Sequence, residues 1–229
     1  GDPLVRMPGS EDFLFTQVDP NRVTTEFGSA VAVGDIQCDP NARYDDVVIG
    51  QRTENKIFIY FGAAVQSTKP YATDPNAADI VITAPSGTAD RIQQFGFAVA
   101  VADLNGDGCG EIIVGAPFSD PGGHTDQGLA YVIFGAGQLA SGQSFTLAAP
   151  PAGVSIVKLT RGVAGKSGDL LGFAVGAGAL PPNNTSDYFV VTARGADATA
   201  PSARTDAGAA HVVVGSELAA ADPNVDFNL

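Results

Sequence analysis

The feature that most restricts the possible folds is a pattern that recurs three times along the 229-residue chain. FGSAVAVGD begins at Phe27, FGFAVAVAD begins at Phe95, and LGFAVGAGA begins at Leu171. Similar segments at a nearly regular spacing are the sequence signature of folds built from repeated structural units. The chain is therefore expected to fold as three equivalent units that pack against one another.

Each of these stretches is followed by further short apolar runs. The second runs are DVVIG, EIIVGAP and DYFVVTA, the third runs are KIFIYFG, LAYVIFG and AAHVVVG, and the fourth runs, in the first two units only, are DIVITAP and VSIVKLT. All are rich in Val, Ile, Phe and Tyr and are bounded by turn-forming Gly, Pro, Asp and Asn, which is the composition of β-strands. No segment shows a convincing apolar stripe of helical period with caps, so the sequence predicts an all-β fold.

Four strands in each repeat predict a β-propeller whose blades are sheets of four antiparallel strands. The first run of every unit is rich in Gly, Ala and Val. Small side chains suit the innermost strands of a propeller, because these strands crowd around a central channel. A β-sandwich, the alternative, does not predict this register of repeats.

The whole chain, 1–229, is expected to form a single propeller or part of one. The first blade is expected over 27–94, the second over 95–170, and a third blade without its fourth strand over 171–229. Residues 1–26 contain DFLFTQVD, which aligns with the fourth runs and is expected to be the fourth strand of a neighbouring or closing blade. The chain thus holds about three blades' worth of strands in a permuted phase.

Three blades are too few for a normal closed propeller, and open sheet edges invite pairing. Further blades are expected from one of three sources: a longer form of the same chain, a second copy, or another subunit. In the second case, residues 13–18 of one copy would complete the third blade of the other. Each alternative predicts that the chain is not self-sufficient.

The second unit, FGFAVAVADLNGDGCGEIIVGAP, resembles the FG-GAP repeat of integrin alpha-chain heads and of many bacterial extracellular proteins. The resemblance extends over nearly the whole chain and is strong in the second unit, good in the first and degenerate in the third. It implies a β-propeller in which the acidic loop between the first and second strands of a blade binds calcium (Ca2+).

The loop of the second unit, DLNGDGCGE, offers oxygen donors at alternating positions. Asp103, Asn105 and Asp107 occupy positions one, three and five, the backbone carbonyl of Cys109 falls at position seven, and Glu111 at position nine. Calcium takes about six to eight oxygen ligands, and such a loop supplies them. Without a cation, the three carboxylates would repel one another. The resemblance implies the same five ligands.

The loop of the first unit, DIQCDPNARYDD, is expected to form a second calcium site, with a metal-free loop as the alternative. Its candidate ligands match the four side-chain positions of the second loop: Asp35, Gln37, Asp39 and Asp46. Asn41 and Asp45 are further candidates. Pro40 replaces the turn glycine, and three extra residues precede Asp46.

The loop of the third unit, ALPPNNTSD, has lost most of these donors. Ala179 and Pro181 replace the first two ligands, and only Asp187 is expected to keep its place, in line with Glu111. No calcium is expected there.

The two cysteines, Cys38 and Cys109, lie in the related loops of the first and second units. A disulfide between them is one possibility, and two small unpaired loop residues are the alternative.

The formal net charge of −13 opposes binding to nucleic acid and to anionic membranes. Apolar runs stay well short of the roughly 18–20 residues that a membrane-spanning helix needs, so no membrane insertion is expected. An acidic surface suits cation binding or solubility outside the cell. We expect an extracellular protein, secreted or at a cell surface, with the periplasm as the alternative.

The sequence offers no recognisable catalytic motif. His124 and His211 fall near no candidate nucleophile and are expected to be structural. TRGVAGKSGD (160–169) resembles a phosphate-binding loop, but it leads into a strand where that motif requires a helix. Arg161 and Lys166 within it are expected to be solvated charges.

The expected function is a non-enzymatic binding, adhesion or scaffold module for a protein or glycan ligand. The resemblance implies adhesion or recognition without identifying the ligand. The alternatives are an accessory or catalytic domain of a secreted hydrolase or lyase, and a structural subunit of a larger surface assembly.

Overall fold

The computed structural model describes residues 26–38, 45–62, 78–87, 89–135, 140–162, 165–179, 186–197 and 205–219, and the backbone of 227–228. The strand expected at 13–18, the candidate ligands Asp39 and Asn41, and Pro181 of the third loop lie outside these residues.

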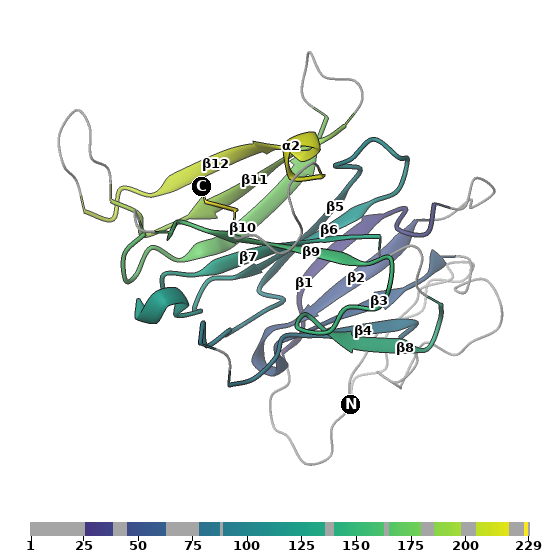
Figure 1. Cartoon of the computed structure of the whole chain (residues 1–229), viewed down its shortest axis with the longest axis horizontal. Coiled ribbons are helices and arrows are strands. Elements are labelled where there is room, and N and C mark those ends of the chain that lie inside the picture. Colours follow the sequence, from purple (N-terminus) through teal and green to yellow (C-terminus); the bar gives the residue numbers. More distant parts are fainter. Residues whose placement is uncertain are drawn as a thin grey trace, which may run out of the picture.

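The described strands form three sheets that stand side by side, one for each repeat (Figure 1). Blade 1 contains β1 (Phe27–Gly34), β2 (Asp46–Gln51), β3 (Lys56–Tyr60), β4 (Ile80–Thr83) and β8 (Gln143–Thr146). Blade 2 contains β5 (Ala98–Ala102), β6 (Glu111–Ala116), β7 (Leu129–Phe134), β9 (Ser155–Thr160) and β13 (Phe227–Asn228). Blade 3 contains β10 (Leu171–Gly178), β11 (Tyr188–Ala193) and β12 (Ala209–Val214). Short helical turns occur at η1 (Arg52–Glu54), η3 (Pro121–Gly123) and α2 (Gly215–Ala219).

The expected all-β fold with sheets of antiparallel strands is confirmed. In the first two units, the four predicted strands pair in sequence order and antiparallel, and in the third unit the first three strands do the same. Such sheets, stacked face to face around the small-residue strands β1, β5 and β10, are the blades of a partial β-propeller (Figure 1).

Blades 1 and 2 also each include a strand from the following unit, which the sequence did not predict. β8 belongs to the second unit, but it pairs parallel with β4 of blade 1, with Ile80 opposite Gln143. β13 belongs to the third unit and pairs in the same way with β9 of blade 2. Each of these two blades therefore receives a fifth, outermost strand from the unit that follows it.

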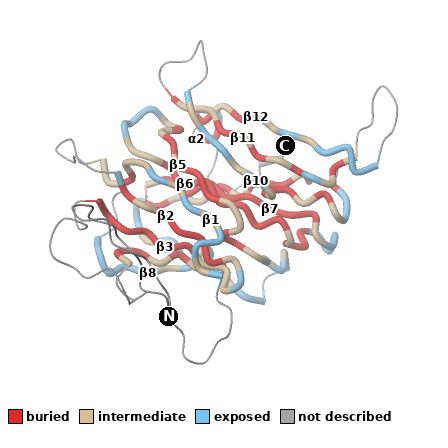
Figure 2. Tube along the Cα trace, turned by 180° about the vertical axis from the view of Figure 1, so that it is seen from behind, coloured by how far each residue is buried: buried red, intermediate tan, exposed pale blue. Residues whose placement is uncertain are grey.

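The core lies between the blades, and blade 2 is buried on both faces (Figure 2). One apolar cluster fills the space between blades 1 and 2 and includes Ile57, Ile112 and Val114. Another lies between blades 2 and 3 and includes Ile113 and Phe189. Because both faces are covered, β6 and β7 are buried at every residue, which explains their continuous apolar runs.

The outer faces of the two end blades are partly uncovered. Val31 and Val33 on β1 are 64% and 58% exposed, and Val212 on β12 is 58% exposed. The residues equivalent to Val31 and Val33 in blade 2 are Val99 and Val101, which pack against the core between blades 1 and 2. Exposed apolar faces of this kind are typical of surfaces that another structural unit covers.

Candidate metal centre

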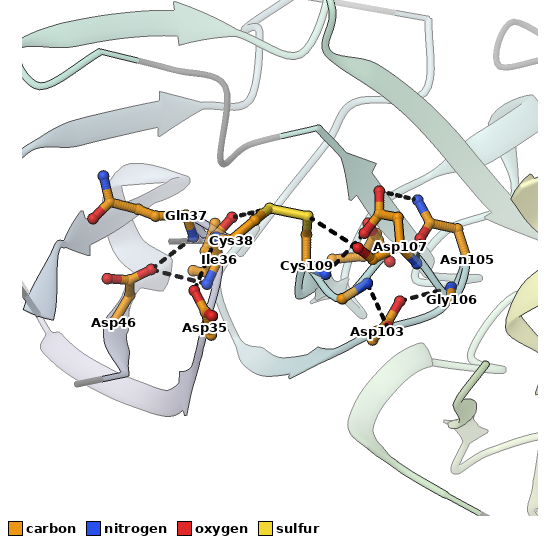
Figure 3. The surroundings of a disulfide bond; sticks show 12 residues. Asp35, Ile36, Gln37, Cys38, Asp46, Asp103, Asn105, Gly106, Asp107 and Cys109 are labelled. Carbon is orange, nitrogen blue, oxygen red and sulfur yellow. Dashed lines mark hydrogen bonds between the residues drawn. A yellow bond between two sulfur atoms is a disulfide. The ribbon is translucent and has the colours of Figure 1, made fainter. Parts of the chain in front are cut away.

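The second-unit loop is a tight turn between β5 and β6, closed by its own side chains (Figure 3). Asp103 accepts hydrogen bonds from two loop amides: Gly106 N donates to Oδ1 at 2.7 Å and Gly108 N donates to Oδ2 at 3.0 Å. Both glycines have positive φ, 81° and 87°, a conformation that glycine adopts without steric cost. The turn therefore depends on the acid at position one and on the glycines that follow it.

Asn105 and Asp107 continue the same pattern (Figure 3). Asp107 N donates to Asn105 Oδ1, and Cys109 N donates to Asp107 Oδ1, each at 2.8 Å. The two side chains also meet directly, because Asn105 Nδ2 donates to Asp107 Oδ2 at 2.9 Å. Every predicted side-chain ligand up to position five is thus held against the loop backbone.

Glu111 opens β6 and is the buried member of the set, with 1% of its surface exposed. Its Oε2 accepts a hydrogen bond of 2.7 Å from Leu104 N. Burial, and then the negative charges of Asp107 and Asp103, raise the pKa of Glu111 to about 8. A buried carboxyl group among other carboxylates is the setting that a bound cation would stabilise in its ionised form.

The donor set has the chemistry of a calcium site. It consists of carboxylate, amide and backbone carbonyl oxygens, which suit a hard cation such as calcium. Among the described residues, no three His, Cys, Asp or Glu side chains converge as a preformed metal cluster. The chemical type of the donors therefore suits calcium, while the carboxylates of Asp103 and Asp107 accept hydrogen bonds from the loop amides.

The first-unit loop is described on either side of residues 39–44. Cys38 N donates to Asp35 Oδ1 at 2.9 Å, so Asp35 closes its loop as Asp103 does. Asp46 is 2% exposed, and its Oδ2 accepts hydrogen bonds from Ile36 N and Gln37 N at 2.9 and 3.1 Å.

Asp46 and Glu111 occupy equivalent places. Asp46 pairs with Gly34 at the end of β1, and Glu111 pairs with Ala102 at the end of β5. Burial raises the pKa of Asp46, and amide hydrogen bonds, the first from Gly62, oppose that rise. Because Asp46 accepts three amide hydrogen bonds, it braces its blade with or without a metal.

The third-unit loop corrects one expectation. Tyr188 pairs with Gly178 at the end of β10, so Tyr188 and not Asp187 stands in the place of Glu111. Asp187 N instead donates to Asp103 O at 2.7 Å, just as Gly110 N donates to Asp35 O at 2.6 Å. Asp187 is therefore the counterpart of Gly110, one residue before the ligand position, and sequence alignment alone missed this shift.

Cys38 and Cys109 form a disulfide that joins the first and second loops, with their Cα atoms 4.7 Å apart (Figure 3). Of the two alternatives that the sequence left open, the bridge is the one formed. The ligand expected from Cys109 is its backbone carbonyl, so the disulfide leaves that oxygen available.

The expectation of a solvated charge is wrong for Arg161, whose side chain is 13% exposed, and it holds for Lys166, whose side chain is exposed. Arg161 Nη1 lies 2.6 Å from Oδ2 of Asp169, whose side chain is 2% exposed. Lys166 Nζ lies 2.8 Å from Oδ2 of Asp197. In the described part of the segment that resembled a phosphate-binding loop, these ion pairs hold Arg161 and Lys166, and residues 165–170 lead directly into β10.

The two histidines lie on separate elements. His124 follows η3 and is exposed, whereas His211 lies within β12 and is half-buried. Burial, and then the positive charge of Arg161, lower the pKa of His211.

Across the part of the chain that is described, no helix has the length and apolar character needed to cross a membrane.

Comparison with known proteins identifies an FG-GAP repeat in the second unit. The family model of the FG-GAP repeat matches residues 95–133. Integrin alpha ina-1 of Caenorhabditis elegans is 39% identical over 97 residues, which covers 36% of this chain and 8% of that protein. Integrin alpha pat-2 of the same organism is 34% identical over 117 residues, or 47% of this chain and 9% of that protein. The chain spans less than a tenth of the length of these relatives. Residues 95–133 therefore form an FG-GAP repeat, and the chain has an integrin-alpha-like fold.

Proposed function

We propose that this chain is an extracellular, calcium-stabilised β-propeller module that binds a protein or glycan ligand and catalyses no reaction. The observation that carries the calcium part is the buried carboxyl group of Glu111, which lies beside the charges of Asp107 and Asp103 in an FG-GAP loop. Similarity to integrin alpha chains supports a binding or adhesion role rather than an enzymatic one.

The second-unit loop is the first calcium site of this proposal. Its ligands are the five expected from the sequence: Asp103, Asn105, Asp107, the carbonyl of Cys109, and Glu111. The ion would supply positive charge among these acids and so fix the loop at the end of blade 2. Its role is structural, since the binding surface of the module lies elsewhere.

The first-unit loop is the second calcium site. Its ligands are Asp35, Gln37, Asp39 and Asp46. The equivalent places of Asp46 and Glu111 at the start of β2 and β6 support this assignment. The amide hydrogen bonds that already occupy Asp46 are expected to make this site the weaker of the two.

An extracellular location is supported by the disulfide, because disulfides persist in oxidising compartments. The exposed outer faces around Val31 and Val212 support a need for further blades, from the same chain, a second copy or another subunit. These blades would complete the propeller, and the ligand would bind to the surface they form together.

Calcium titration tests the proposal. We expect calcium to bind in isothermal titration calorimetry and to raise the melting temperature of the oxidised protein. Asp103→Ala and Asp107→Ala should each abolish binding in the second loop. Glu217→Ala, which removes an exposed acid from α2, is the matched control and should bind calcium as the wild type does. A melting temperature that is the same in calcium and in chelator would refute the calcium proposal.

A further inference from the structure

The disulfide is attached where both loops are expected to bind calcium. Cys109 lies between the candidate ligands Asp107 and Glu111, and its amide donates to Asp107 Oδ1 at 2.8 Å. Cys38 directly follows the candidate ligand Gln37, and its amide donates to Asp35 Oδ1 at 2.9 Å. The covalent link therefore constrains the backbone of both loops next to their ligands.

The disulfide is an addition to a contact that blades make without it. Gly110 N donates to Asp35 O at 2.6 Å across blades 2 and 1, close to the disulfide. Asp187 N makes the same bond to Asp103 O, at 2.7 Å, across blades 3 and 2, although the third-unit loop has no cysteine to form a second disulfide. Because blades 2 and 3 are joined by this bond and by their shared apolar core, with no disulfide between them, docking of a blade does not require the disulfide.

We infer that the Cys38–Cys109 disulfide makes calcium affinity depend on the redox state of the protein. This inference rests on the calcium proposal above. A bound ion must hold the loop in one conformation, and a crosslink that already restricts the loop reduces the entropy lost on binding. Reduction frees the peptide of Cys109 at position seven, so binding must then order it. We expect the affinity to fall at least about fivefold, within the usual range of coupling between sites.

The coupling must act in both directions. Reduction by a dithiol breaks the S–S bond, and each sulfur takes one electron and one proton to give two thiols, while the dithiol becomes a disulfide. If the oxidised form binds calcium more tightly, calcium must make this reduction less favourable by the same factor. A tenfold difference in affinity corresponds to a midpoint shift of about 30 mV for this two-electron couple.

The first experiment compares calcium affinity across redox states. Calorimetry is run on the oxidised wild type, on the wild type reduced with dithiothreitol, and on Cys38→Ser/Cys109→Ser. We expect the last two to bind calcium equally and more weakly than the first. Val191→Ala, which removes buried volume from the core between blades 2 and 3, is the control for general destabilisation. It should melt earlier and keep the affinity of the oxidised wild type.

The second experiment needs no variant. The wild type is equilibrated in dithiothreitol redox buffers with calcium or with chelator, and its free thiols are counted after alkylation. We expect calcium to shift the midpoint to a more reducing potential. Equal affinities in both redox states, or a midpoint that calcium does not move, would overturn the coupling and leave the calcium proposal standing. Failure of the oxidised protein to bind calcium would instead overturn the calcium proposal itself.

Discussion

Gly115 on β6 lies directly beneath the backbone carbonyl of Gly172 in the next blade. A Cβ on Gly115 would stand 2.0 Å from Gly172 O. Blades 1 and 2 meet in the same way, because a Cβ on Gly50 would stand 2.1 Å from Gly96 O. Close approach of a carbonyl to a glycine is therefore the contact that brings the inner parts of neighbouring blades together.

We predict that Gly115→Ala destabilises the chain by about 1–3 kcal/mol or more, because the obstructing atom belongs to the backbone and the blades must move apart. Gly176→Ala on β10 is the matched control, since a Cβ there meets nothing within 4 Å. Its effect should stay within about 0.5 kcal/mol. Urea denaturation measures both values, and equal stabilities of the two variants would contradict this account of blade packing.

The blade plan could be predicted because each blade repeats both its apolar pattern and its turns. The pairing of β8 with β4 of blade 1 could not be predicted. Gln143–Thr146 is largely exposed, and the sequence of β4 contains no pattern that identifies β8 as its parallel partner. Pairing of Cys38 with Cys109 depends on a distance between blades, which sequence spacing does not give.

For the candidate metal site, the sequence could indicate a loop but not its geometry. Alternating oxygen donors make the second-unit loop the candidate, but only the structure shows that the Asp103 carboxylate accepts hydrogen bonds from the loop amides. The position of Asp187 was misjudged by one residue, because loop length alone does not set where the next strand begins to pair.

His211 provides a prediction on pH. Its register partner is Val191, and the equivalent positions in blades 1 and 2 hold Phe58 and Tyr131. Burial, followed by the charge of Arg161, lowers its pKa below the ordinary 6.5. The unfolded chain therefore binds a proton more tightly than the folded chain, and stability present above pH 6.5 is lost as the pH falls toward the lower folded value.

We predict that His211→Phe reduces the fall in melting temperature between about pH 7.5 and about pH 5.5, the range in which histidine titrates. A phenyl ring at this position matches Phe58 of blade 1 and carries no charge at any pH. His124→Gln removes an exposed histidine and should leave the pH profile unchanged. If both variants follow the wild-type profile, His211 does not contribute to acid sensitivity.

Because the outer faces of blades 1 and 3 are uncovered, we predict that copies of the chain associate with one another. We expect the isolated chain to form larger species as its concentration rises, because Val31, Val33 and Val212 expose apolar surface at the ends of the row of blades. Val31→Asp/Val33→Asp should weaken this association, as judged by light scattering after size-exclusion chromatography. Ala152→Asp, in an exposed turn, adds charge elsewhere and should not. A monomer at every concentration tested would show that these faces do not drive association.

The ion pairs of the turn before β10 differ in burial and so in expected strength. The side chains of Arg161 and Asp169 are 13% and 2% exposed, and Asp169 Oδ2 also accepts a hydrogen bond of 2.7 Å from Lys166 N. Asp169→Ala would leave the guanidinium partly buried without its partner. We predict a loss of about 3 kcal/mol in the free energy of unfolding. Lys166→Ala breaks the more exposed pair with Asp197 and should cost much less, because solvent screens an exposed ion pair. Chemical denaturation of the two variants side by side measures the difference, and a larger loss for Lys166→Ala would reverse the assignment of Asp169 as the structural acid of this turn.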